Sequence, residues 1–133
     1  NLADGILIKD NHIEALRSQE MGVKEVVQKA LAGASHTLKV EVEVESLEGL
    51  QEALAAGADI VMLDNMGVDQ MREAMVIAKG KTVVEASGGI NLETVRSVAE
   101  TGVDLISIGG LTHSTQALDI SLDLEFFNKH CTK

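Results

Sequence analysis

The sequence has 133 residues, a length that suits one domain with a hydrophobic core, and 45% of them are hydrophobic. Its formal net charge of −10 argues against nucleic acid as a partner, because phosphate backbones bind clusters of lysine and arginine. No apolar run approaches the roughly 20 residues that span a bilayer, so we expect no membrane partner. The only cysteine, Cys131, excludes an intrachain disulfide, and we expect a cytoplasmic location.

Short apolar runs alternate with amphipathic stretches along the chain. Runs rich in β-branched residues predict strands at 5–9, 38–45, 59–63, 82–86 and 104–108. Apolar residues spaced by three and four predict helices at 23–32, 47–56, 68–79 and 92–100. Ser46 is a suitable N-cap for the second of these helices, and Gly57 a suitable end. The segment after Thr112 fits either a strand or a helix, and 126–133 is predicted to be a tail.

The alternation predicts βαβ units and therefore a parallel sheet. Residues 56–63 also resemble 101–108, since both run from a helix end through glycine and aspartate into a buried strand. We expect an α/β fold over 1–125, namely an incomplete (β/α) barrel of the TIM type with about five βα units. Its missing strands are expected before Asn1.

The strand at 38–45 alternates strictly between valine and charged residues. Val40, Val42 and Val44 share one face, and Lys39, Glu41, Glu43 and Glu45 share the other. In a barrel the valines would pack on helices and the charged residues would point inward. At the edge of an open sheet the charged face would be solvated instead, and the periodicity leaves both arrangements open.

Polar residues follow every predicted strand, at the ends where (β/α) barrels place their sites. Two strands stop at glycine pairs, whose backbone N–H groups can cradle an anion; the alternative is two tight turns without a ligand. Asn91 after the first pair, and Thr112 or Ser114 after the second, are candidates to open a helix whose dipole favours phosphate. Carboxylates at other strand ends suit sugar hydroxyls or Mg²⁺. The candidate site comprises Lys9, Glu43, Asp64, Ser87, Gly88, Gly89, Gly109, Gly110 and His113. Taken alone, Lys9 and His113 also fit structural roles, and His12 is given no catalytic role.

Five segments carry a family resemblance: IKDNH at 8–12, KVEVE at 39–43, GADIVMLDN at 57–65, EASGGI at 85–90 and GVDLISIGGLTH at 102–113. In order and spacing they resemble quinolinate phosphoribosyltransferase, also called carboxylating nicotinate-nucleotide pyrophosphorylase. The resemblance implies transfer of phosphoribose from phosphoribosyl pyrophosphate to the ring nitrogen of quinolinate, with decarboxylation. The products are nicotinate mononucleotide, pyrophosphate and CO₂, on the route to NAD. It also implies Mg²⁺ with the pyrophosphate, and a homo-oligomer, a dimer or higher.

The resemblance assigns roles to the candidate residues. Lys9 would contact the anionic substrates. Glu43 and Asp64 would face the ribose hydroxyls or Mg²⁺ and stabilise positive charge at the anomeric carbon. The 5′-phosphate would be held by Ser87, Gly88, Gly89, Gly109, Gly110 and His113.

The chain departs from the family in the cations that clamp the two quinolinate carboxylates. In the family these come from a His-Arg pair before the first strand, from earlier residues and from a neighbouring subunit. Here Arg17, Arg72 and Arg96 all fall in helix-like stretches. We therefore expect a fragment of the enzyme that is inactive alone. Two alternatives are a relative with another acceptor, such as the molybdenum-transport paralogue, and a non-catalytic phosphate-binding barrel module.

Overall fold

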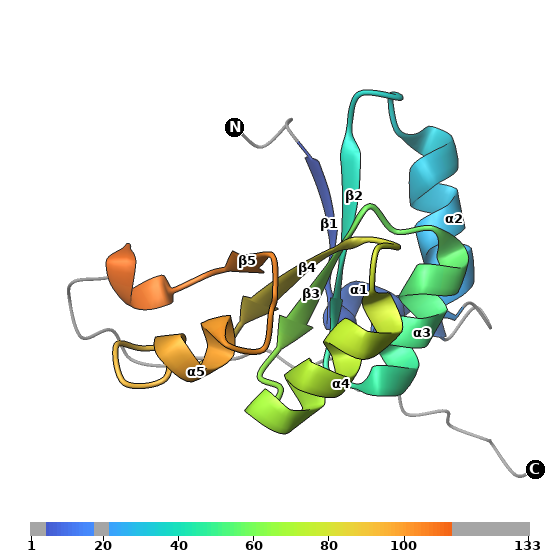
Figure 1. Ribbon diagram of the computed structural model, residues 1–133. Helices are drawn as coiled ribbons and strands as arrows, with labels where there is room; N and C mark the ends of the chain where they lie inside the picture. Colours follow the sequence, from blue (N-terminus) through green and yellow to red (C-terminus); the bar gives the residue numbers. More distant parts are fainter. Residues whose placement is uncertain (1–4, 18–21, 113–133) are drawn as a thin grey trace, which may run out of the picture.

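The computed structural model describes residues 5–17 and 22–112 (Figure 1). Within them a single five-stranded sheet has the order β1-β2-β3-β4-β5, and all four neighbouring pairs are parallel. The strands are β1 (Gly5–Ile8), β2 (Lys39–Val44), β3 (Ile60–Asp64), β4 (Val83–Ser87) and β5 (Leu105–Ile106). All five predicted strands are confirmed, each within a few residues of its expected bounds.

The helices are α1 (Asp10–Arg17), α2 (Val23–Gly33), α3 (Leu47–Ala56), α4 (Val68–Ala78), α5 (Val95–Ala99) and the 3₁₀ turn η1 (Gly109–Leu111). The predicted helices at 23–32, 47–56 and 68–79 are confirmed within one residue as α2, α3 and α4. Helix α1 begins at once after β1, where we expected only a polar strand end. Helix α5 is shorter than the predicted 92–100, because the Asn91 side chain accepts from the N–H groups of Glu93 and Thr94 and folds that segment into a turn. The predicted tail, 126–133, lies outside the described residues.

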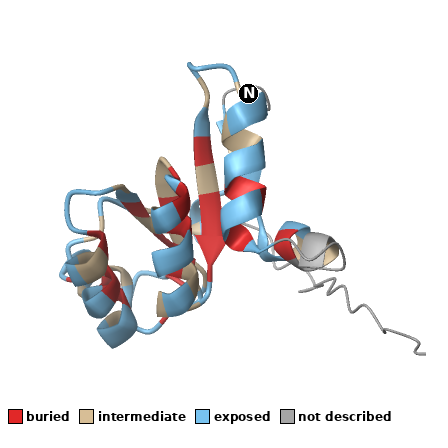
Figure 2. Cartoon of the chain, turned by 90° about the vertical axis from the view of Figure 1, so that its right-hand side faces the viewer, coloured by how far each residue is buried: buried red, intermediate tan, exposed pale blue. Residues whose placement is uncertain are grey.

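The core lies between the sheet and the helices that cover one of its faces (Figures 1 and 2). Val40, Val42 and Val44 are buried there, with Leu50 of α3 and Met71 of α4 in the same cluster. Burying a side chain such as Leu50 contributes about 1.5–3 kcal/mol. The valine face of β2 thus packs on helices, as the barrel alternative predicts, and β2 lies between β1 and β3, so the edge-strand alternative is wrong.

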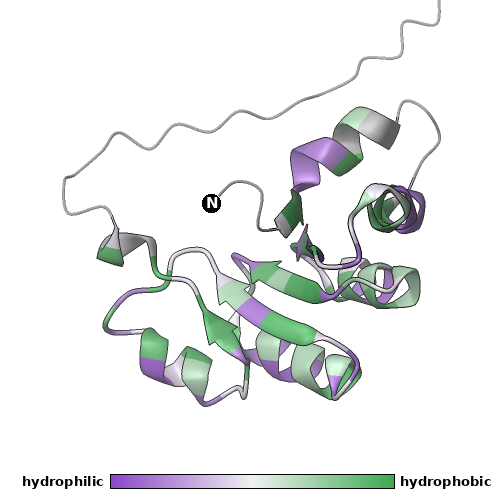
Figure 3. Ribbon diagram, turned by 90° about the horizontal axis from the view of Figure 1, so that it is seen from above, coloured by the Kyte–Doolittle hydropathy of each residue, from purple (hydrophilic) through white to green (hydrophobic). Residues whose placement is uncertain are grey.

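The opposite face of the sheet, here called the open face, mixes apolar and acidic side chains. The strand register aligns Leu7, Glu41, Ile60 and Val83 in one row, and Glu43, Met62, Glu85 and Leu105 in the next. Leu7, Val83 and Leu105 are 41%, 39% and 47% exposed, since no helix in the described part of the chain covers this face (Figure 3). The five strands form an open sheet, and closure into a barrel stays a prediction.

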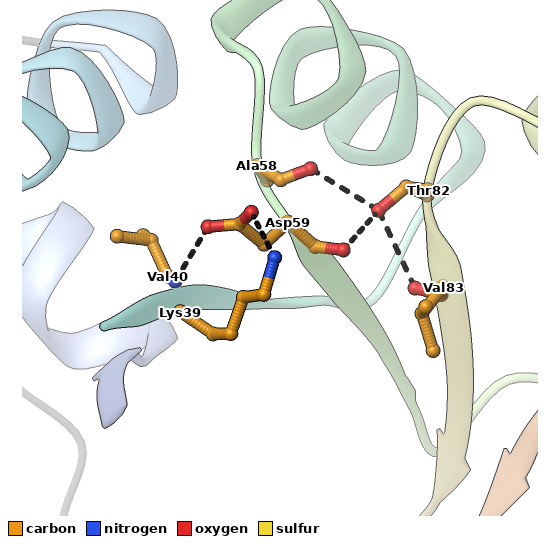
Figure 4. Close-up of polar contacts among 6 residues, drawn as sticks. All are labelled: Lys39, Val40, Ala58, Asp59, Thr82 and Val83. Atoms are coloured by element: carbon orange, nitrogen blue, oxygen red, sulfur yellow. Dashed lines mark hydrogen bonds and ion pairs between the residues drawn. The ribbon is translucent and has the colours of Figure 1, made fainter. Parts of the chain in front are cut away.

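Two aspartates join neighbouring strands at the amino-terminal edge of the sheet. Asp59 Oδ2 accepts from the N–H of Val40 at 2.9 Å (Figure 4). The N–H of Asp59 donates to the Val40 carbonyl at 3.0 Å. Asp104 repeats both bonds with Val84, at 2.8 and 2.9 Å. The sequence repeat at 56–63 and 101–108 therefore places an aspartate before each of two strands, where it forms two hydrogen bonds with the neighbouring strand. Each such pair of hydrogen bonds is called an aspartate clamp below.

Candidate functional site

The carboxyl-terminal edge of the sheet brings two predicted residues together. Lys9 Nζ, just beyond β1, lies 3.6 Å from Glu43 Oε2 on β2. The Glu43 side chain is only 9% exposed, whereas that of Lys9 is 53% exposed. The ammonium group can therefore reach solvent or a ligand while it remains paired with a mostly buried carboxylate.

The pKa of the Glu43 carboxyl is raised above its usual value. Burial is the largest cause, Lys9 opposes it, and the negative charges of Asp64 and Asp10 add to the increase. Asp64 is thus close enough for its charge to act on Glu43. Two neighbouring carboxylates can stabilise positive charge that develops on a ligand.

Asp64 ends β3, and Asn65 follows it at the loop. The Asn65 side-chain amide donates to Asp64 Oδ2 at 2.8 Å. The half-buried Asp64 carboxylate is therefore held by the next residue of the chain. Asp64 is aligned with Ser87, the last residue of β4, so it lies beside the end of that strand.

The two glycine-rich turns line one pocket of about 540 Å³. Five of the predicted residues belong to it: Ser87, Gly88, Gly89, Gly109 and Gly110. Of the described residues, Ile90, Ser107, Ile108 and Thr112 also line it. Thus the ends of β4 and β5 converge as predicted, and the sixth expected member, His113, lies outside the described residues.

The two glycine pairs have different backbones. Gly88 and Gly89 have φ of 84° and 62°, in the left-handed region that favours glycine. Gly109 and Gly110 do not share this conformation and belong to η1. The first turn thus requires glycine for its conformation, whereas the second leaves open space where a side chain would stand.

Three residues at this edge were missed by sequence reasoning. His12 Nδ1 accepts from the Lys9 N–H at 3.0 Å, so this histidine braces the turn that carries the lysine. Ser107, in the pocket, donates its hydroxyl to Glu85 Oε1 across β4 and β5. Asn65 is the third, and its only sequence signal is an asparagine at a strand end, a residue type that tolerates φ above zero.

The described residues contain no group of three or more His, Cys, Asp or Glu side chains that could hold a metal ion. Glu43 and Asp64 offer two carboxylates at most. Such a pair fits Mg²⁺ that is held mainly by substrate phosphates, since magnesium commonly uses one or two protein carboxylates there.

The fold and this edge define a parallel α/β protein with acidic strand ends beside a glycine-lined pocket, the place where such folds bind ligands. A family model, "Quinolinate phosphoribosyl transferase, C-terminal domain", matches residues 1–123. The chain therefore belongs to the quinolinate phosphoribosyltransferase family and carries its C-terminal domain.

Individual relatives agree with this assignment. A probable carboxylating nicotinate-nucleotide pyrophosphorylase of Bacillus subtilis is 46% identical over 128 residues, which are 96% of this chain and 43% of that protein. The Homo sapiens enzyme of that name is 40% identical over 122 residues, 90% of this chain and 40% of the relative. The crystal structure of NadC from Streptococcus pyogenes superposes with a TM-score of 0.78 at 43% identity, covering 90% of this chain and 40% of that one. The chain thus spans about two fifths of these relatives.

Proposed function

We propose that the protein transfers phosphoribose from phosphoribosyl pyrophosphate to quinolinate, with decarboxylation to nicotinate mononucleotide. The observation that carries this proposal is the arrangement along one sheet edge, where the Lys9–Glu43 pair and Asp64 are followed by the glycine-lined pocket. Both of the curated relatives reported above carry the name of this activity.

The pocket is proposed to hold the 5′-phosphate. Its glycines have no side chains to cover their main-chain N–H groups, and successive N–H groups in glycine-rich turns bind anions without lysine or arginine. Ser87 and Ser107 supply hydroxyls, and His113 is proposed to add a further donor. Such a site suits a chain with a net charge of −10.

The acidic strand ends are proposed to act on the ribose. Glu43 and Asp64 would stabilise the positive charge that develops at the anomeric carbon when pyrophosphate leaves, and Lys9 would contact the anionic substrates. A Mg²⁺ ion bound with pyrophosphate would supply positive charge to the leaving group. In this arrangement Glu43 and Asp64 would contribute carboxylate oxygens to the metal or the ribose hydroxyls.

The acceptor is proposed to be bound mainly by residues beyond this chain. Arg72 and Arg96 lie on α4 and α5 in surface ion pairs with Asp69 and Glu100, away from the strand ends. We therefore propose that the quinolinate clamp comes from the remainder of a longer, oligomeric protein, and that the isolated chain is inactive.

No helix in the described ranges is long and apolar enough to cross a membrane.

A substitution at Glu43 tests the proposal in the full-length protein. Glu43→Gln should lower kcat roughly 100-fold, the typical loss when one transition-state-stabilising group is removed. The KM for phosphoribosyl pyrophosphate should change far less, because the effect is confined to the transition state. A matched Glu45→Gln variant, at an exposed residue just beyond the end of β2, should keep its activity. A wild-type protein that accepts another pyridine or purine base but not quinolinate would redirect the proposal to a different acceptor.

Ligand binding to the isolated chain is a second test. Nicotinate mononucleotide should shift NMR signals of Gly88, Gly89, Gly109 and Gly110, whereas quinolinate should shift almost none. Shifts confined to the neighbourhood of Lys9 and Glu43, with no change at the glycines, would show that the proposal assigns the phosphate to the wrong residues.

A further inference from the structure

Asn65 lies between Asp64 and the glycine-lined pocket, in an unusual conformation. Its φ of 51° is the only positive value at a non-glycine residue in the described part of the chain. Asparagine is one of few residue types that visit this region, because its short side chain forms local hydrogen bonds. Backbone held in a sparsely populated region is often found at functional sites.

The Asn65 side chain acts on Asp64. Its Nδ2 donates to Asp64 Oδ2 at 2.8 Å, a distance typical of a hydrogen bond to a charged carboxylate. The bond orients the carboxylate through one oxygen, so that the other oxygen can face a ligand.

The Asn65 backbone acts on the pocket. Its N–H donates to the Ser87 carbonyl at 3.1 Å, which joins the loop after β3 to the last residue of β4. Gly88 approaches so closely that a Cβ on it would lie 2.6 Å from the Asn65 nitrogen. One residue thus contacts both the carboxylate and the first glycine-rich turn.

We propose that Asn65 is a positioning residue that couples Asp64 to the phosphate pocket. Its amide sets the orientation of the carboxylate, and its backbone sets where the Gly88 turn stands relative to that carboxylate. The proposal deepens the proposed function and rests on it, since a ribose 5-phosphate would have to meet both groups at once.

The first test needs no activity. In the full-length protein, Asn65→Gly keeps a residue that adopts positive φ but removes the amide. The substitution should shift the NMR resonance of the Asp64 carboxyl carbon in the ligand-free protein. The same pair of spectra in concentrated urea gives the contribution of the changed sequence neighbour, which is subtracted. An Asp64 resonance that does not move beyond this correction overturns the proposal, whatever the protein catalyses.

The second test is a double-mutant cycle on transfer activity, because residues that act through one another are not additive. Asn65→Gly alone should lower kcat about tenfold, the loss expected from one hydrogen bond to a charged group. In an Asp64→Ala background the same substitution should change kcat less than about twofold. Equal losses in both backgrounds would show that Asn65 acts independently of Asp64 and would overturn the proposal. A wild-type protein without transfer activity would contradict the proposed function instead, and the NMR result would still decide the role of Asn65.

Discussion

Among single residues, Gly88 is constrained both by its backbone conformation and by the atoms that surround it. It has a φ of 84°, and an added Cβ would overlap atoms of Asn65. Gly80 has a similar φ of 71°, but its Cβ would meet nothing within 4 Å. A comparison of alanine substitutions at the two glycines therefore separates the free-energy cost of a positive φ from the cost of a steric overlap.

Gly88→Ala should weaken phosphate binding at least tenfold and lower the unfolding free energy by more than Gly80→Ala does. Gly80→Ala should cost only the roughly 1–2 kcal/mol of a left-handed alanine and leave binding intact. Urea unfolding and phosphate titration of both variants give the comparison. Equal effects of the two substitutions would show that the Asn65 contact has no energetic weight.

Glu41 lies on the open face, where one of its oxygens, Oε1, is buried and accepts no hydrogen bond among the described residues. Burial raises the pKa of the Glu41 carboxyl, and the nearby charge of Glu85 raises it further. Between the ordinary pKa and this higher value the folded state binds more protons than the unfolded state. The stability contributed by Glu41 is therefore present at low pH and is lost as the pH rises through that window.

Glu41→Gln should accordingly raise the midpoint of thermal unfolding at pH 7, because this pH lies above the usual glutamate pKa and the raised pKa of Glu41 then disfavours the folded state. At pH 4 the gain should nearly vanish, because glutamine then replaces a neutral carboxyl group. Glu45→Gln, at an exposed residue just beyond the end of the same strand, serves as the control. A gain that is larger at pH 4 than at pH 7 would contradict the assigned cause.

At the scale of strands and helices, the Asp59 clamp holds β2 to β3. Asp59→Ala should lower the unfolding free energy by about 1–3 kcal/mol, because the N–H of fully buried Val40 loses its acceptor. Asp69→Ala on α4 is a suitable control: it removes an ion pair with Arg72 whose carboxylate side is 97% exposed, and such pairs contribute about 0–1 kcal/mol. Urea unfolding measures both, and similar losses would mean that the clamp is no stronger than a surface ion pair.

Acid should act through the same aspartate. The hydrogen bond from the Val40 N–H lowers the pKa of the Asp59 carboxyl, with Lys39 adding to the effect. This stabilisation is present above the usual aspartate pKa and is lost as the pH falls through the lower folded value.

Strands and helices could be predicted from the sequence wherever one periodicity dominated. The strict alternation in β2 and the Ser46 cap of α3, whose hydroxyl accepts from the Gly49 N–H, were both confirmed. The length of α5 could not be predicted, because a local Asn91 turn competes with the helix and periodicity does not register that competition. At the site, the convergence of Ser87 and the glycine pairs followed from parallel topology. The roles of His12 and Asn65 depend on individual hydrogen bonds, from Lys9 to His12 and from Asn65 to Asp64 and Ser87, which leave no pattern in the sequence.

At the scale of the whole molecule, the open face is the feature that sets this chain apart from a self-sufficient domain. Leu7, Val83 and Leu105 are exposed on it, although large apolar side chains on the face of a sheet are suited to burial. The relatives are more than twice as long as the matched region. We propose that further residues of a longer protein cover this face.

Leu105→Gln tests this coverage. In the full-length protein it should lower the unfolding free energy by about 2 kcal/mol, the value of burying a leucine side chain. In the chain of 133 residues it should cost less than about 0.5 kcal/mol, as expected of surface substitutions. Val76→Gln, on the outer side of α4 and 77% exposed, should be nearly neutral in both proteins. A loss of the same small size for Leu105→Gln in both would contradict coverage of the open face.

The aspartate clamps also govern how accurately the strands align during folding. A slip of one residue between β2 and β3 would turn Glu43 toward the helices and its valine neighbours toward the open face, because side chains alternate along a strand. Asp59 forms its pair of bonds with Val40 in the native alignment and loses them after such a slip. A misaligned sheet is therefore less stable than the native one, because it lacks these hydrogen bonds at the edge opposite the glycine-lined pocket. The residues that favour the correct strand alignment and the candidate functional site thus lie at opposite ends of the same strands.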